Sequence, residues 1–212
     1  GVEENAVARN AARALGKLGP AAQPAITDLL ATLEDPDDGL REAAARALGD
    51  LGAQEAVEPI CRRLASGLEG AGALRPGTPR LMEPCEALLE ALGDIGDHDP
   101  AVVAAIVPFI HHDRPLIRSA AYRALLQLTG ERQWGERLEA LLADPLLQVR
   151  RAALMDLGAA GWRASLDAIT STHAENSLKL IALRGLVENG ADGRQGEAPG
   201  TEAVLAAMDS LL

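Results

Sequence analysis

Apolar and polar residues alternate along much of the chain with the spacing of an α-helix. In the segment Leu40–Gly49 (LREAAARALG), positions one, four, five, eight and nine are apolar, whereas positions two, three and seven are charged. Steps of three and four residues place the apolar side chains on one face of a helix. The segment is therefore predicted to be a helix that buries one face and exposes another.

This ten-residue pattern recurs along the chain. Its last position falls at residues 16, 49, 93, 126, 158 and 187, in steps of 33, 44, 33, 32 and 29 residues. The copies are Val7–Gly16, Leu40–Gly49, Pro84–Gly93, Ile117–Leu126, Val149–Gly158 and Leu178–Val187. A further helix and an Asp/Pro-rich turn, such as EDPDDG, HHDRP or ADPLL, precede several copies. Two short helices cannot bury an apolar face alone, so neighbouring repeats must stack. The sequence predicts an all-α fold, a right-handed α-solenoid of about six HEAT-like repeats.

The repeats define the expected boundaries. We expect the solenoid over residues 1–187, a Gly-rich loop over 188–200, and a C-terminal helix over 201–212 that packs on the last repeat. The glycine at position ten of most copies is predicted to cap the C-terminus of its helix. The third repeat carries 11 extra residues within Gly67–Pro84. Such an insertion is either part of a binding face or a tolerated surface loop.

Composition supports the helical prediction and narrows the partners. Aromatic residues make up 2% of the chain while hydrophobic residues make up 48%, which favours closely packed helices rich in Ala and Leu. The net charge of −11 argues against nucleic acid or an anionic membrane as partner.

Targeting signals add little. We find no run of about 18 apolar residues, so no membrane span is expected, and no signal-peptide pattern. Two cysteines make no disulfide framework, which fits a reducing compartment. Because the chain begins with Gly1, we expect the natural N-terminus to be longer.

Positions three, six and seven of each copy are predicted to face outward, onto the concave groove of a HEAT solenoid. These residues are Arg9, Ala12, Arg13, Glu42, Ala45, Arg46, Glu86, Leu89, Glu90, Ser119, Tyr122, Arg123, Arg151, Leu154, Met155, Leu180, Leu183 and Arg184. Arginines gathered in an acidic protein suit a ligand that carries carboxylates. The alternative is that these arginines are solvated and pair with neighbouring glutamates, which is the usual case for outward arginines on a helix.

Two positions of the repeat carry unexpected polar residues. Position two is an arginine in three copies, and position eight is an aspartate in one copy. Arg41, Arg118 and Arg150 share position two, and we interpret them as structural residues that bridge to the turn carboxylates of neighbouring repeats. Asp156 occupies position eight, where other copies carry an apolar residue. A buried carboxylate needs a partner. It either pairs with a neighbouring arginine or backbone N–H, or lies at the floor of the groove.

No familiar catalytic or metal motif accompanies these features. The four histidines show no ligand spacing with Cys61 or Cys85, so no metal site is expected. We also find no Ser-His-Asp arrangement, phosphate loop or dinucleotide fingerprint.

Several stretches depart from an ordinary HEAT pattern. They read VARNAARALGKLG, ERQWGERLEALLADPLLQVRRAALMDLGAAG, AENSLKLIALRGL and MDSLL. In these stretches the chain resembles the phycobilin lyases, and more narrowly the E-type subunit of the heterodimeric phycocyanobilin lyase that acts on the phycocyanin α-subunit. The resemblance runs from about residue 5 to the last residue.

The resemblance implies an enzyme that attaches a linear tetrapyrrole, expected to be phycocyanobilin, to a cysteine of a phycobiliprotein through a thioether bond. It implies an F-type HEAT-repeat subunit as partner and a cytoplasmic location, associated with the thylakoid phycobilisome. The bilin is the substrate, and no cofactor is expected. The alternative is a non-catalytic HEAT scaffold, or a carrier of bilin or phycobiliprotein.

Roles follow for the groove side chains under this reading. Guanidinium groups would pair with the two propionates, carboxylates would accept from pyrrole N–H groups, and Tyr122 and Met155 would pack on the ring plane. The expected substrate-binding residues are Arg123 and Arg151, then Arg46 and Arg184, with Glu86, Tyr122 and Met155. Acid assistance is expected from Asp156 and Glu90.

Overall fold

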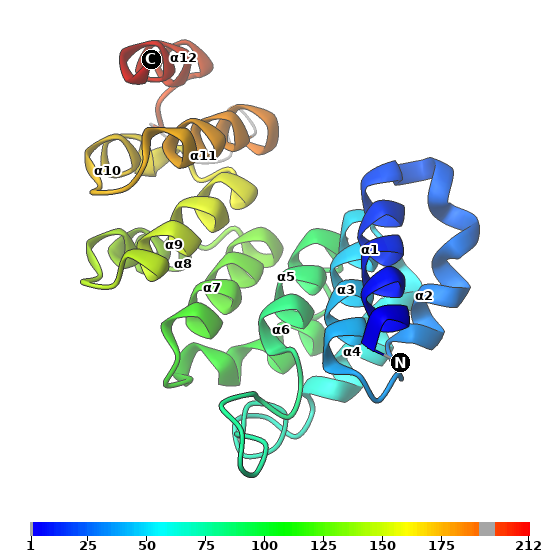
Figure 1. Ribbon diagram of the computed structural model, residues 1–212. Coiled ribbons are helices and arrows are strands. Elements are labelled where there is room, and N and C mark those ends of the chain that lie inside the picture. The colour runs from blue at the N-terminus through cyan, green and yellow to red at the C-terminus, as the bar shows by residue number, and fades with distance from the viewer. Residues whose placement is uncertain (1, 191–197) are drawn as a thin grey trace. The chain divides into compact units, whose positions relative to one another are not determined.

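The protein is built mainly of helices, and residues 65–84 form its longest described stretch without one. A computed structural model describes residues 2–190 and 198–212. Within them the only β-structure is an isolated bridge between Leu74 and Leu81, so the all-α prediction is confirmed. The elements (Figure 1) are α1 (Val2–Leu18), η1 (Gly19–Ala25), α2 (Ile26–Thr32), α3 (Asp38–Asp50), η2 (Gln54–Ala56), α4 (Val57–Leu64), α5 (Cys85–Ile95), α6 (Pro100–Ile106), η3 (Val107–His111), α7 (Pro115–Thr129), α8 (Arg132–Ala140), η4 (Leu141–Ala143), α9 (Leu147–Ala160), η5 (Arg163–Ser165), α10 (Leu166–Ser171), α11 (Asn176–Asn189) and α12 (Thr201–Leu211).

The chain forms two compact units, Gly1–His112 and Asp113–Leu212. In the first unit the repeat helices α1, α3 and α5 pack side by side, with α2 against α3 and α4 against α5 (Figure 1). In the second unit α7, α9 and α11 do the same, with α8 against α7 and α9. Helix α12 packs on α10 and α11. Helix α11 continues to Asn189, so the loop expected over 188–200 begins later, and its residues 191–197 lie outside the described residues.

The repeat helices are buried on more of their surface than the pattern indicates. Position six was expected to face outward, but this expectation is wrong. The residues at this position are buried in every copy: Ala12, Ala45, Leu89, Tyr122, Leu154 and Leu183. The reason is that a repeat helix is flanked on both sides, as α3 is by α1 and α5, so only a narrow strip is left in solvent.

The glycines at position ten lie inside their helices and are not C-caps, contrary to the prediction. A Cβ on Gly49 would lie 2.9 Å from the Cα of Ala91, and one on Gly158 would lie 2.9 Å from the Cα of Ala182. These glycines therefore let neighbouring repeat helices touch through their backbones. The actual caps follow about three residues later, in left-handed conformation, at Gly96, Gly130 and Gly161.

Position-two arginines hold the turns between helices. Arg41 Nη1 donates to the carbonyls of Asp35 (2.8 Å) and Pro36 (3.1 Å). Arg150 Nη1 likewise donates to Asp144 (2.7 Å) and Pro145 (3.0 Å). The structural role is therefore confirmed. Arg41 also reaches the expected carboxylate of the neighbouring repeat, Glu83 (3.2 Å), whereas Arg150 donates to main-chain carbonyls, including that of His173 (2.9 Å). An arginine reaches such carbonyls whatever side chains the turn carries.

Candidate functional site

The residues expected to bind and activate a ligand lie in both compact units, and each group is described within its own unit. Arg46, Glu86 and Glu90 belong to the first unit. The second unit holds Tyr122, Arg123, Arg151, Met155, Asp156 and Arg184.

In the first unit, a single guanidinium is surrounded by three carboxylates. Arg46 on α3 contacts Glu42 on the same helix (Nε–Oε1 3.4 Å) and Glu86 on α5 (Nη2–Oε1 3.7 Å). It also pairs through Nη1 with Glu90, whose side chain is only 12% exposed. Burial disfavours the charged guanidinium, but Glu90, Glu42 and Glu86 outweigh this and raise the pKa of Arg46 above its ordinary value.

In the second unit, Asp156 is a buried carboxylate held by two residues of α7. Ser119 and Arg123 lie one turn apart on α7 and both face Asp156 on α9. The Ser119 hydroxyl donates to Oδ2 of Asp156, and Arg123 Nη1 lies 3.4 Å from Oδ1. All three side chains are at least largely buried, with Asp156 4% exposed. The expected pairing with a neighbouring arginine is thus present, and Ser119 is a partner that sequence reasoning missed.

Tyr122 lies beside this cluster in sequence but points elsewhere. Its ring is buried and stacks on Trp134 of α8, with centroids 6.2 Å apart and planes 19° apart. The guanidinium of Arg137 lies 5.2 Å from the Trp134 ring centroid. Tyr122 therefore contributes to packing between α7 and α8, and its contact with a ligand remains a prediction.

The other two arginines of the second unit that were expected to bind the ligand, Arg151 and Arg184, lie in exposed ion pairs. Arg151 pairs with Glu175 through both Nε (3.0 Å) and Nη2, and both side chains are nearly half exposed. Arg184 pairs with Glu188, one turn along α11 (2.7 Å). Met155 is 41% exposed. Exposed pairs contribute roughly 0–1 kcal/mol, so an incoming carboxylate can replace the protein's own at little cost.

The described part of the chain shows no arrangement for a resident metal. Within residues 2–190 and 198–212, no cluster of three or more His, Cys, Asp or Glu side chains is placed to hold an ion. In the same ranges, none of the helices has both the length and the hydrophobicity needed to cross a membrane.

Stacked helix pairs with charged strips define a helical-repeat protein, and residues 3–70 match the HEAT-repeat family. The chain is 45% identical over 213 residues to the phycocyanobilin lyase subunit alpha of Picosynechococcus sp., covering 96% of this chain and 75% of the relative. It is 47% identical over 212 residues to the bilin biosynthesis protein RpcE of Synechococcus sp. strain WH8020, covering 99% and 75%. The chain belongs to the family of phycocyanobilin lyase alpha subunits.

A solved structure supports the same relationship at the level of the fold. The complex of CpcE and CpcF of phycocyanin lyase from Nostoc sp. contains a chain 44% identical in sequence, with a TM-score of 0.85. The match covers 96% of this chain and 73% of that one.

Proposed function

We propose that the chain is the alpha-type, or E-type, subunit of a bilin lyase. Together with an F-type HEAT-repeat partner it attaches a linear tetrapyrrole, phycocyanobilin, to a cysteine of the phycocyanin alpha subunit. The observation that carries this proposal is 45% identity over 96% of the chain to a phycocyanobilin lyase alpha subunit. The enzyme acts in the cytoplasm, at the thylakoid-associated phycobilisome, and needs no cofactor because the bilin is its substrate.

In this reaction the chain binds and orients the bilin, and it does not supply the nucleophile. The acceptor's cysteine thiolate adds to the ethylidene group of the bilin, which forms the C–S bond, and a proton is taken up by the tetrapyrrole. The nucleophile therefore belongs to the acceptor. Fixing the pigment in one orientation supplies most of the rate gain in such an addition.

Binding of the pigment is assigned first to Arg151 and Arg123. The two propionates of a bilin are carboxylates, and a guanidinium pairs with a carboxylate through two parallel hydrogen bonds. Arg151 is supported most directly, because its pair with Glu175 is about half exposed and can be exchanged. Arg46 is secondary, because three carboxylates, among them the largely buried Glu90, already surround it. Arg184, in its exposed pair with Glu188, is the other secondary candidate, and Met155 offers exposed apolar surface to a ring.

Carboxylates have the complementary role. Glu42, Glu86 and Glu90 place carboxylate oxygens around Arg46, and such oxygens are the acceptors that pyrrole N–H groups need. Negative charge also favours the protonated tetrapyrrole, which is the better electrophile. Asp156 would act in the same sense in the second unit, with Ser119 and Arg123 fixing its orientation.

The test is co-expression with the F-type subunit, the bilin-synthesis enzymes and the apo-phycocyanin alpha subunit. We expect a covalent product that fluoresces with zinc on a denaturing gel. Complete absence of this product, with all partners present, would support the scaffold alternative.

A matched pair of variants tests the site. Arg151→Ala should weaken bilin binding about tenfold, because one charge-assisted pair is lost. Arg132→Ala removes a guanidinium that is likewise ion-paired, with Glu136, and is more exposed (72% against 45%), so it serves as the control. Equal bilin affinity in the two variants would remove Arg151 from the site.

A further inference from the structure

The 11-residue insertion in the third repeat forms an ordered hairpin. Arg75 N donates to the carbonyl of Arg80 (2.8 Å), and Met82 N donates to the carbonyl of Ala73 (2.9 Å). Gly77 makes the turn between them with a φ of 73°, which suits glycine. The segment between α4 and α5 therefore has a regular hydrogen-bonded conformation and is not an irregular loop.

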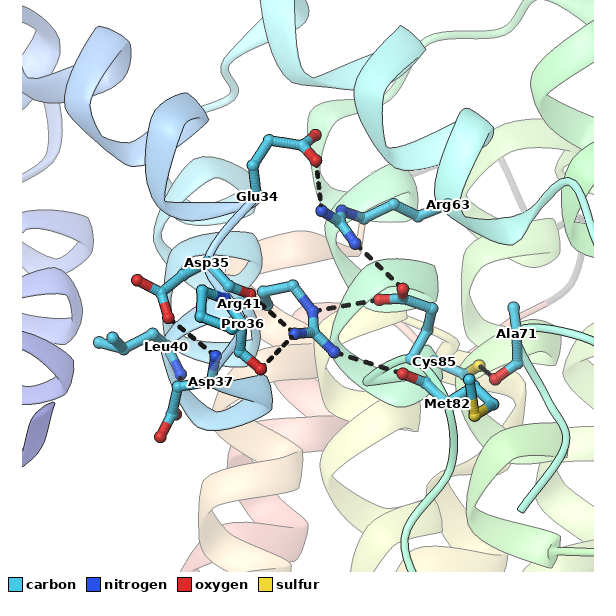
Figure 2. Close-up of polar contacts among 11 residues, drawn as sticks. Glu34, Asp35, Pro36, Asp37, Leu40, Arg41, Arg63, Ala71, Met82 and Cys85 are labelled. Carbon is cyan, nitrogen blue, oxygen red and sulfur yellow. Dashed lines mark hydrogen bonds and ion pairs between the residues drawn. The ribbon is translucent and has the colours of Figure 1, made fainter. Parts of the chain in front are cut away.

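A charge network ties the base of this hairpin to two repeats (Figure 2). Glu83 accepts from Nε of Arg41 (3.2 Å) and from Nη1 of Arg63 (3.0 Å). Arg41 also donates to the carbonyl of Met82 (3.3 Å), and Arg63 donates to Glu34 (2.6 Å). Arg41 is 5% exposed, so its bonds to Glu83 and Met82 are shielded from water and contribute more than surface pairs, whereas Glu34 is 64% exposed.

Further bonds hold the other strand of the hairpin. The buried thiol of Cys85 lies 3.3 Å from the carbonyl of Ala71, as Figure 2 shows. His112 Nε2 lies 3.0 Å from the carbonyl of Gly72. Both ends of the hairpin are thus fixed, and its tip is presented in one position.

The surface that is presented is apolar and basic. Leu74 is 58% exposed and Met82 is 43% exposed. Both line an open cavity of about 440 Å³ beside the hairpin, together with Arg63, Ala73 and Pro76 and with two carboxylates, Glu69 and Glu83. Residues 70–82 contain two arginines, Arg75 and Arg80, and no carboxylate, although the whole chain carries a net charge of −11.

We propose that the hairpin of residues 73–82 docks the acceptor protein. The occupant is an acidic segment of the acceptor whose apolar side chain enters the cavity between Leu74 and Met82, while its carboxylates pair with Arg75 and Arg80. Arg80 now pairs with Asp38 (3.1 Å), but its side chain is 69% exposed, so this partner is easily exchanged. An acidic segment is repelled by the net charge of the molecule and attracted by this carboxylate-free stretch.

The size of the surface distinguishes the acceptor from the partner subunit. A stable interface buries about 800 Å² on each partner, which is more than ten hairpin residues can supply. The hairpin therefore fits a protein that binds and leaves again, as the acceptor must after each attachment. This inference rests on the proposed function, because that function defines which protein is released.

Two variants and two matched controls test the docking. Leu74→Ser/Met82→Ser removes the apolar contact, and Arg80→Glu reverses the charge. The controls are Leu146→Ser/Leu147→Ser, exposed at 53% and 37%, and Arg132→Glu, whose side chain is 72% exposed and ion-paired like that of Arg80. The lyase heterodimer is titrated with apo-phycocyanin alpha subunit, and KM and kcat for attachment are measured.

We expect the hairpin variants to raise Kd and KM for the acceptor about tenfold and to leave kcat and bilin affinity near their original values. The controls should leave all four quantities unchanged. Unchanged acceptor affinity in both hairpin variants would overturn the proposal, as would weakened binding of the F-type subunit with normal binding of the acceptor. If circular dichroism shows that Leu74→Ser/Met82→Ser has lost helical content, the acceptor affinity of Arg80→Glu alone tests the proposal.

The two proposals fail separately. Normal attachment with an unchanged KM in the variants would contradict docking and leave the lyase function in place. Hairpin-dependent binding of the acceptor by a heterodimer that attaches no bilin would contradict the lyase function and support docking.

Discussion

The carboxylate of Asp156 sets the polar contact between α7 and α9. It stands at a position that is apolar in the other copies of the repeat, and it is 4% exposed. A buried carboxylate is tolerated only with donors around it, and α7 supplies Ser119 and Arg123. Because both donors lie on one face of α7, the contact fixes how the two helices align. It also holds Asp156 in one orientation.

Removing the serine should therefore be costly. Ser119→Ala is expected to lower the free energy of unfolding by about 1.5–3 kcal/mol, the range for hydrogen bonds to charged groups. Ser165→Ala is the control, since Ser165 is equally buried but donates to the neutral carbonyl of Trp162 (2.6 Å), so a loss of about 1 kcal/mol is expected. Urea denaturation measures both. A smaller loss for Ser119→Ala than for Ser165→Ala would contradict the assignment of a charged acceptor.

The thiol of Cys61 should titrate late. Burial, and then the charges of Asp97, Glu58 and Asp99, raise the pKa of the Cys61 thiol above its ordinary value. The thiolate is the reactive form, so at pH 8 iodoacetamide should alkylate Cys61 more slowly than a cysteine in an unstructured peptide. The pH at half-maximal rate should be higher than for that peptide.

Mass spectrometry of the Cys85→Ser variant reports on Cys61 alone. Cys85 itself is fully buried, so in the native protein it should react only after unfolding. Equal rates for Cys61 and the peptide at pH 8 would show that neither burial nor the neighbouring carboxylates act on the thiol.

At the scale of elements, close backbone contact is the main device that joins neighbouring repeats. Gly158 of α9 and Gly185 of α11 face each other, and a Cβ on Gly185 would lie 2.6 Å from the carbonyl oxygen of Gly158. The same device joins α3 to α5 at Gly49 and Ala91. Small residues at these points explain how a chain with few aromatic residues can still fill its core.

A methyl group at this contact should force the helices apart. Gly158→Ala is expected to destabilise the protein by about 1–3 kcal/mol through overpacking, although alanine is the better helix former. Gly200→Ala is the control, because a Cβ there meets nothing within 4 Å and the φ is −69°. Thermal unfolding compares the two. A stabilised Gly158→Ala variant would mean that helix propensity outweighs the contact.

For the whole molecule, the repeat period predicted the fold class and the resemblance predicted the family, and both are confirmed. The repeat period predicts which face of each helix is apolar, but it does not predict how many neighbouring helices cover the other faces. For this reason Leu89, Leu154 and Tyr122 were expected in solvent and are buried. Ion-pair partners such as Glu175 for Arg151 lie in other repeats, and a single sequence does not identify such pairs. The site assignments therefore remain predictions.

The contacts of Arg41 and Arg150 have a consequence for how the repeats diverge. Each arginine donates to main-chain carbonyls of its turn. These carbonyls are present whatever side chains the turn carries. The turns EDPDDG and ADPLL can thus accumulate substitutions while the bend survives, except at the aspartates Asp35, Asp37 and Asp144. The carboxylates of these three residues also accept main-chain N–H bonds. Substitutions can remodel these two corners provided that Arg41 and Arg150 are retained, whereas the first and third copies carry Ala8 and Cys85 at this position.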